Sequence, residues 1–197
     1  KIAASSLEIE CLDDQRLVDI AVIAGRGQQD LAGLVVEGAR LVGRDKLLDP
    51  DFKLADAVIA REGTQNQVFR GVLINKQTLN KEMPSSLEQA IVLAIDDALQ
   101  PEDLNREAMK TEAGFQYYLQ ARQQYEDNLN RLLELGVNLI AVDRSIDAIA
   151  EEIFTEAGIM VIQRVSSREM DRLCQHTGAK KIKANALNRP AQVLKKY

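Results

Sequence analysis

Residues 137–179 read VNLIAVDRSIDAIAEEIFTEAGIMVIQRVSSREMDRLCQHTGA, and this stretch decides the fold. Two apolar runs in it, 137–142 and 159–162, have the length of a strand and are rich in β-branched residues. Between them, apolar residues recur from Ile146 to Phe154 at steps of three and four, which is typical of a helix with one buried face. A strand, a crossing helix and a second strand with short connections predict two parallel neighbouring strands.

The ends of the predicted helices are marked by small and polar residues. Gly158 is a predicted C-cap for the first helix, because a glycine accepts a left-handed turn. Ser166 or Ser167 is the predicted N-cap of a second helix, which Gly178 ends. The stretch therefore predicts an α/β architecture, but these features identify no catalytic or ligand-binding residue.

Composition limits the classes of protein that fit the chain. It has 197 residues, of which 46% are hydrophobic and 28% charged, as in ordinary globular proteins. The net charge of -5 argues against a nucleic-acid binder, and no apolar run approaches the ~20 residues that cross a membrane. The two cysteines, Cys11 and Cys174, lie far apart and fit a reducing compartment, so we expect a cytoplasmic protein. Because the sequence starts at Lys1 rather than Met, we also expect a piece of a longer protein.

The sequence before residue 137 predicts helices first and strands later. Residues 1 to about 48 show two amphipathic helical stripes, interrupted by glycines at 25 and 27. Apolar runs at 52–59, 68–76 and 90–95 predict strands, and the last of them is apolar throughout. A charge-flanked loop at 63–67 is the predicted domain boundary.

The segment from 96 to 135 is the most informative about function. Four of the eight aromatic residues lie between positions 115 and 125, and a helical stripe runs from Tyr118 through the leucines that follow. That stripe is most simply the buried face of a helix. Four apolar residues lie outside it beside polar neighbours, and exposed apolar groups of this kind favour a binding surface: Leu104, Met109, Phe115 and Tyr117.

Several motifs in this chain resemble the apical domain of group II, thermosome-like chaperonins. Residues 164–173, RVSSREMDRL, with TGA at 177–179, are similar to that family's R-V-K-K-S-D-M-x-K-L and T-G-A segments. Residues 136–140 resemble its G-A-N-V-V strand, and residues 71–76 resemble its G-V-V-I-D-K run. The sequence departs from the family's H-P-G-M-P element at residues 80–82.

The resemblance implies a fold and a division into domains. Residues 1–65 would be the first, mainly helical part of the intermediate domain. Residues 66–185 would be the substrate-binding apical domain, with a β-sheet or sandwich core flanked by helices and a helical protrusion at about 99–115. Residues 186–197 would be a basic tail leading to the return segment.

The resemblance also implies a function, which is capture and enclosure of non-native polypeptide in a ring of sister subunits. The helix after the protrusion would face the chamber with Tyr117, Ala121, Gln124 and Asn128, on the side opposite the buried stripe. Together with the apolar residues named above, the predicted polypeptide-binding and lid residues are Leu104, Met109, Phe115, Tyr117, Ala121, Gln124 and Asn128.

No catalytic residue or metal site is predicted. The only histidine is His176, and Cys174 nearby cannot complete a set of four metal ligands. The family's G-D-G-T-T phosphate loop does not occur in the sequence, so ATP and magnesium are expected only in the longer parent protein, and this chain is not expected to be an enzyme.

Two other hypotheses remain open from the sequence. The first is a small α/β ligand- or nucleotide-binding module or enzyme built on residues 137–179, with its ligand at the carboxyl ends of the strands. Asp143, Arg144, Gln163 and Arg164 would line that site. The second is an assembly module with an inert surface, which replacement of Phe115 and Tyr117 by serine would distinguish from a chaperone.

Overall fold

The structure is a computed structural model that describes residues 13–101 and 110–194. The chain divides into two compact units, Lys1–Gly71 and Val72–Tyr197. The assignment of these units to intermediate and apical domains stays a prediction. In the described residues, no helix is both long enough and apolar enough to cross a membrane.

The first unit is helical, as predicted for the residues described. It contains α1 (Asp14–Ala24), α2 (Gln29–Val42), the short α3 (Arg44–Leu47) and a 3-10 helix, η2 (Leu54–Ala57). The strand predicted at 52–59 is wrong, because η2 occupies that position. Val58 and Ile59, which follow it, are exposed, so their apolar character does not indicate a buried strand.

The second unit is built on a three-stranded parallel sheet. Its strands are β1 (Val92–Ile95), β2 (Leu139–Val142) and β3 (Met160–Ile162), in the order β1-β2-β3. Leu93 lies opposite Ile140, and Ile140 lies opposite Val161. The prediction that the strands of 137–162 are parallel neighbours is confirmed, and so is the buried strand within 90–95.

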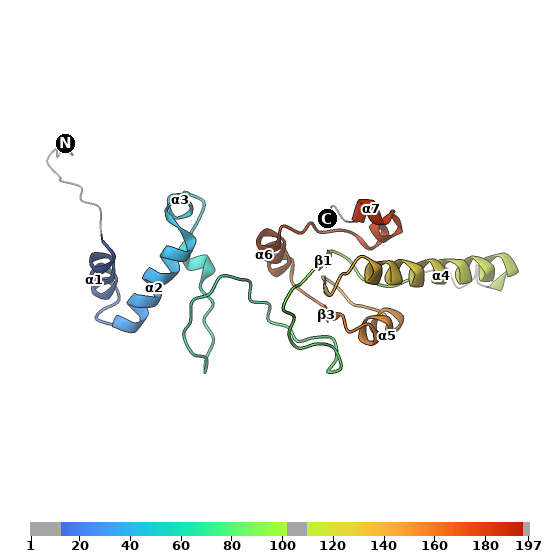
Figure 1. The fold of residues 1–197 in the computed structure, drawn as a ribbon, viewed down its shortest axis with the longest axis horizontal. Helices are drawn as coiled ribbons and strands as arrows, with labels where there is room; N and C mark the ends of the chain where they lie inside the picture. The colour runs from blue at the N-terminus through green and yellow to red at the C-terminus, as the bar shows by residue number, and fades with distance from the viewer. Residues whose placement is uncertain (1–12, 102–109, 195–197) are drawn as a thin grey trace. The chain divides into compact units, whose positions relative to one another are not determined.

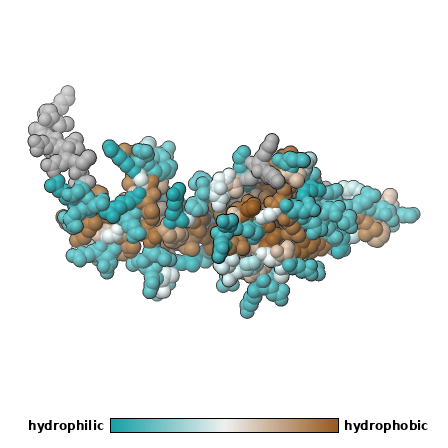
Figure 2. Space-filling model, viewed as in Figure 1, coloured by the Kyte–Doolittle hydropathy of each residue, from teal (hydrophilic) through white to brown (hydrophobic). Residues whose placement is uncertain are grey.

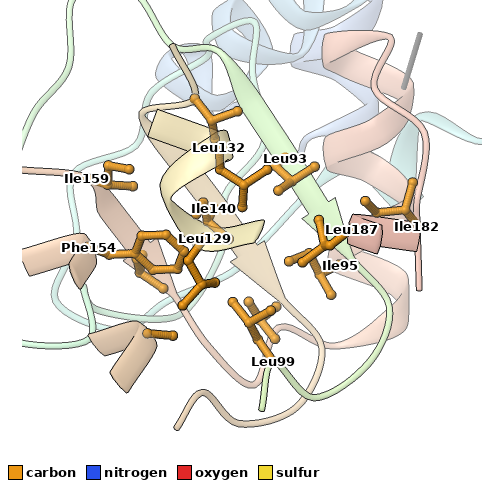
Figure 3. Close-up of a cluster of buried hydrophobic side chains, with 14 of the residues drawn as sticks. Leu93, Ile95, Leu99, Leu129, Leu132, Ile140, Phe154, Ile159, Ile182 and Leu187 are labelled. Carbon is orange, nitrogen blue, oxygen red and sulfur yellow. The ribbon is translucent and has the colours of Figure 1, made fainter. Parts of the chain in front are cut away.

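Helices cover both faces of this sheet (Figure 1). On one face lie α4 (Glu112–Glu134), α5 (Ala148–Glu156), the 3-10 helix η4 (Ala184–Asn188) and α7 (Ala191–Leu194), and on the other lies α6 (Ser167–Thr177). Alternate strand residues point to opposite faces, as the pleat requires. Ile95 and Ile140 join the larger core, which Figure 3 shows with Leu129 and Phe154, whereas Ala94 joins the α6 side.

Local hydrogen bonds explain where the helices begin and end. Asp147 is the N-cap of α5, and its carboxylate accepts hydrogen bonds from two backbone N–H groups. Ser166, rather than Ser167, caps α6 and forms a capping box with Glu169. Gly178 ends α6 at φ 78°, a left-handed conformation that glycine adopts without steric cost.

The segment before the sheet differs from the prediction. Residues 68–76 form no strand, and the N–H of Asn75 instead donates to Oε1 of Glu169 at 3.0 Å. Where the sequence departs from the family pattern, Asn80 organises the turn. Its Nδ2 donates to Glu151 and Thr155 of α5, and its Oδ1 accepts from the N–H groups of residues 82 and 83.

Candidate functional site

Helix α4 consists of an anchored half, residues 125–134, which contains all its buried residues, and a second half, residues 112–124, which we call free only because none of its residues is buried. In the anchored half, Tyr125, Leu129 and Leu132 are buried in the main core. The hydroxyl of Tyr125 donates to Oδ1 of Asp147 at 2.7 Å, which ties α4 to the start of α5. The predicted buried stripe of this helix is confirmed for these residues.

Side chains on another side of the anchored half bind η4 and the residue after it. Nδ2 of Asn128 donates to Oδ1 of Asn188 at 2.6 Å, and Oδ1 of Asn128 accepts from Nε2 of Gln124 at 3.1 Å. Arg131 donates to the carbonyl oxygens of Leu187 and Arg189. These bonds fix the direction in which α4 leaves the core.

The expectation that Asn128 lies opposite the buried stripe is wrong. Asn128 is 4% exposed, and its amide is used in the contact with η4. The residues from Tyr117 to Asn128 that were predicted to face the chamber share one side of the helix. Near Asn128, however, η4 covers that side, so it is no longer exposed. Gln124 is exposed and Ala121 is half-buried, so both stay in the candidate surface.

The free half of α4, residues 112–124, contains no buried residue and extends beyond the sheet and the other helices of its unit (Figure 1). Phe115 is 49% exposed, Tyr117 is 50% exposed and Leu119 is 42% exposed. Figure 2 shows an apolar area among hydrophilic surface toward the far end of this helix. Large apolar side chains exposed close together are typical of a surface that binds another molecule.

The predicted protrusion at about 99–115 is only partly described. Leu104 and Met109 lie outside the described residues. At its start, Leu99 is fully buried in the main core, and its N–H donates to the carbonyl of Ser145. At its end, residues 112–115 already belong to α4, which Thr111 caps.

The free half carries little charge. Residues 113–121 contain no Asp, Glu, Lys, Arg or His. Beyond them, Nε of Arg122 lies 3.1 Å from Oε1 of Glu126, one turn along the helix. The hydrogen bond to Glu126, with a further one to Tyr118, raises the pKa of Arg122.

Sequence reasoning missed three residues of this surface, namely Gln116, Leu119 and Gln120. All three are exposed on the free half of α4. The helical stripe that starts at Tyr118 indicates only the buried side of the helix. A signal was nevertheless present, because Phe115 and Leu119, and likewise Gln116 and Gln120, are four residues apart and so adjacent on a helix.

The carboxyl ends of the strands do not resemble an open ligand site. Nη1 of Arg144 lies 3.9 Å from Asp97, and Nζ of Lys183 lies 3.1 Å from the Asp96 carboxylate. The N–H of Arg144 donates to the carbonyl of Asp97, and the N–H of Arg164 donates to the carbonyl of Arg144. The carboxylates of Asp96 and Asp97, which follow β1, are thus paired with Lys183 and Arg144, and this pairing makes them less available to a ligand.

No group of three or more His, Cys, Asp or Glu side chains that could hold a metal ion occurs among residues 13–101 and 110–194. Burial raises the pKa of the Cys174 thiol, which makes the reactive thiolate less available.

Comparison with known proteins identifies the family. The model of the TCP-1/cpn60 chaperonin family matches residues 1–192, so the chain belongs to this family. It is 29% identical over 189 residues to a thermosome subunit of Pyrococcus abyssi, covering 88% of this chain and 34% of that protein. It is 26% identical to thermosome subunit alpha of Halobacterium salinarum, covering 89% of this chain and 33% of that protein. The chain thus spans about a third of the length of these relatives.

Solved chaperonin structures have the same fold. A group III chaperonin in the open state matches with a TM-score of 0.81 and 43% identity, covering 93% of this chain and 37% of that one. An open-state group II chaperonin monomer from Methanococcoides burtonii matches with a TM-score of 0.60 and 19% identity, covering 93% of this chain and 42% of that one. The predicted α/β fold and the thermosome-like resemblance are confirmed, while the more similar of these two structures is a group III chaperonin.

Proposed function

We propose that this chain binds non-native polypeptide through the free half of α4. The observation that carries the proposal is the exposure of Phe115, Tyr117 and Leu119 on a helix that extends beyond the core of a chaperonin-family protein. Ala121 and Gln124 continue this surface toward the core. Asn128 is left out of it because it is buried.

The physical basis is burial of apolar surface against a client. Fully burying a side chain such as Phe or Leu contributes about 1.5–3 kcal/mol, so a half-exposed one contributes about 1 kcal/mol. A single copy of the surface therefore binds weakly. In a ring of sister subunits, several such surfaces hold one client, and binding becomes much tighter without any new contact.

Enclosure of the client by an ATP-driven ring completes the proposal. ATP and its magnesium would bind in parts of the longer protein that carry the phosphate loop, since this sequence lacks one. The chain itself would be a binding module rather than an enzyme. Its working partners would be unfolded chains and sister subunits in the cytoplasm.

The test is suppression of client aggregation by the 197-residue chain. Insulin B chain, released by reducing insulin, aggregates and scatters light, and the chain is expected to delay this whether or not ATP is present. The double variant Phe115→Ser/Tyr117→Ser is expected to lose most of the effect. Serine, phenylalanine and tyrosine have similar helix propensities, so α4 itself is retained.

The matched control is Ile23→Ser, which removes an apolar side chain that is 80% exposed on α1. It is expected to suppress aggregation as well as the unmodified chain. Equal suppression by the Phe115/Tyr117 variant and the unmodified chain would contradict the proposal and favour an inert assembly module. Suppression that requires ATP would contradict the division of roles between this chain and the parent protein.

A further inference from the structure

We propose that Gln116 and Gln120 hold an extended, uncharged segment of the client along the free half of α4 by hydrogen bonding to its backbone. The inference rests on the proposed function and specifies what the same surface recognises. Both glutamines are exposed, and neither makes a side-chain hydrogen bond to a described residue. The next two glutamines differ, because Gln123 donates to Asp127 and Gln124 donates to Asn128.

The spacing of the two amides fits a polypeptide in the β conformation. Residues four apart on a helix are separated by about 6 Å along its axis. Peptide groups on one edge of an extended chain repeat every two residues, or about 6.6 Å. A carboxamide both donates and accepts hydrogen bonds, as a peptide group does. Gln116 and Gln120 can therefore pair with two successive peptide groups of an extended segment, whatever its side chains are.

Apolar groups flank the two amides. At 3.6 residues per turn, Phe115 and Leu119 lie on one side of the Gln116–Gln120 line, and Tyr117 lies on the other. Side chains of an extended chain point alternately to opposite sides. A client laid along the amides would thus place apolar side chains against Phe115 and Leu119 and against Tyr117.

The absence of charge limits which segments fit. Residues 113–121 carry no acidic or basic side chain, and Arg122 is paired with Glu126. Glu112, one turn before Gln116, is the one other charged residue of the free half. An acidic client segment, or a basic one that lies away from Glu112, would lose hydration here without gaining an opposite charge, which is unfavourable. Binding should therefore favour uncharged segments and depend little on salt.

The test measures the Kd of a fluorescent, uncharged peptide for the chain and for its Gln116→Ala/Gln120→Ala variant. The peptide has about eight residues, so in the extended conformation it is slightly longer than the helical free half. Alanine favours helix, so α4 is retained. Loss of two hydrogen bonds is expected to raise Kd about tenfold. Raising the salt concentration from about 50 mM to about 500 mM should change the Kd of the unmodified chain less than twofold. Asn130→Ala, an exposed amide on the anchored half, is the control and should bind as the unmodified chain does.

A second peptide, methylated on its central backbone nitrogens, isolates the contribution of the backbone. If the glutamines bind peptide groups, their replacement by alanine should raise the Kd of the methylated peptide much less than tenfold. The hydrogen bonds that the peptide N–H groups would donate to the glutamines are already missing in that peptide. Equal losses for the two peptides, or no loss for either, would overturn the inference. If the Phe115→Ser/Tyr117→Ser variant loses binding while the glutamine variant keeps it, the inference fails and the proposed function stands. If the unmodified chain binds neither the peptide nor an unfolded protein, the proposed function itself fails.

Discussion

The anchored half of α4 should depend on the hydrogen bond from Tyr125 to Asp147. Tyr125 is 8% exposed, and its hydroxyl lies 2.7 Å from Oδ1 of Asp147. Tyr125→Phe keeps the ring and its packing but removes this bond. A hydrogen bond to a charged group contributes about 1.5–3 kcal/mol. Asp147 keeps its backbone donors Ile149 and Ala150, so we expect the lower value, about 1.5 kcal/mol.

Tyrosine fluorescence during urea unfolding measures this loss in the second unit alone. All four tyrosines lie after residue 71, and the chain has no tryptophan. Tyr125→Phe should lower the free energy of unfolding without changing the urea dependence. In an Asp147→Ala background, which has already lost the α5 cap, the same substitution should cost almost nothing. An equal loss in both backgrounds would show that the hydroxyl does not act through Asp147.

Three further predictions concern stability and pH. Burial, with the hydrogen bond to Asp147, raises the pKa of Tyr125. The contribution of the Tyr125 hydroxyl to the free energy of unfolding is therefore complete below about pH 10 and declines progressively as the pH rises above it. The stability advantage over Tyr125→Phe should therefore shrink when urea unfolding is repeated as the pH rises past 10, and a constant advantage would contradict this. Hydrogen bonds from Asn75 and Ser166 lower the pKa of Glu169, so the advantage over Glu169→Gln, about 0.5 kcal/mol after solvent screening, should disappear as the pH falls below about 4. Asn80→Ala should lower the free energy of unfolding by about 2 kcal/mol and speed proteolysis of residues 78–83. Unchanged proteolysis would show that Asn80 does not hold this loop.

The elements that sequence reasoning predicted well are those with a local cause. The strands at β2 and β3 are apolar runs of strand length, and Gly178 ends α6 through its own backbone freedom. The wrong strands, at 52–59 and 68–76, have the same apolar composition but find no partner in a sheet. Strand formation depends on a distant partner, and composition alone does not reveal whether one exists.

The candidate site was predictable in position but not in orientation. Exposed Phe115 and Tyr117 stood out because aromatic residues are few in this chain. Asn128 was placed on the wrong side, because its burial depends on Asn188, sixty residues later. A helical stripe shows which residues share a side of α4, but not which neighbouring segment covers that side or where the cover ends.

The central claim, that the free half of α4 binds clients, is tested most directly by hydrogen exchange of the chain with and without a permanently unfolded protein, reduced and carboxymethylated α-lactalbumin. The client is expected to slow amide exchange in residues 112–124 and to leave α1 and the anchored half of α4 unchanged, because a helix segment without buried residues opens locally more often and bound side chains suppress this opening. Slowed exchange confined to the carboxyl ends of β2 and β3, with none in residues 112–124, would contradict the claim.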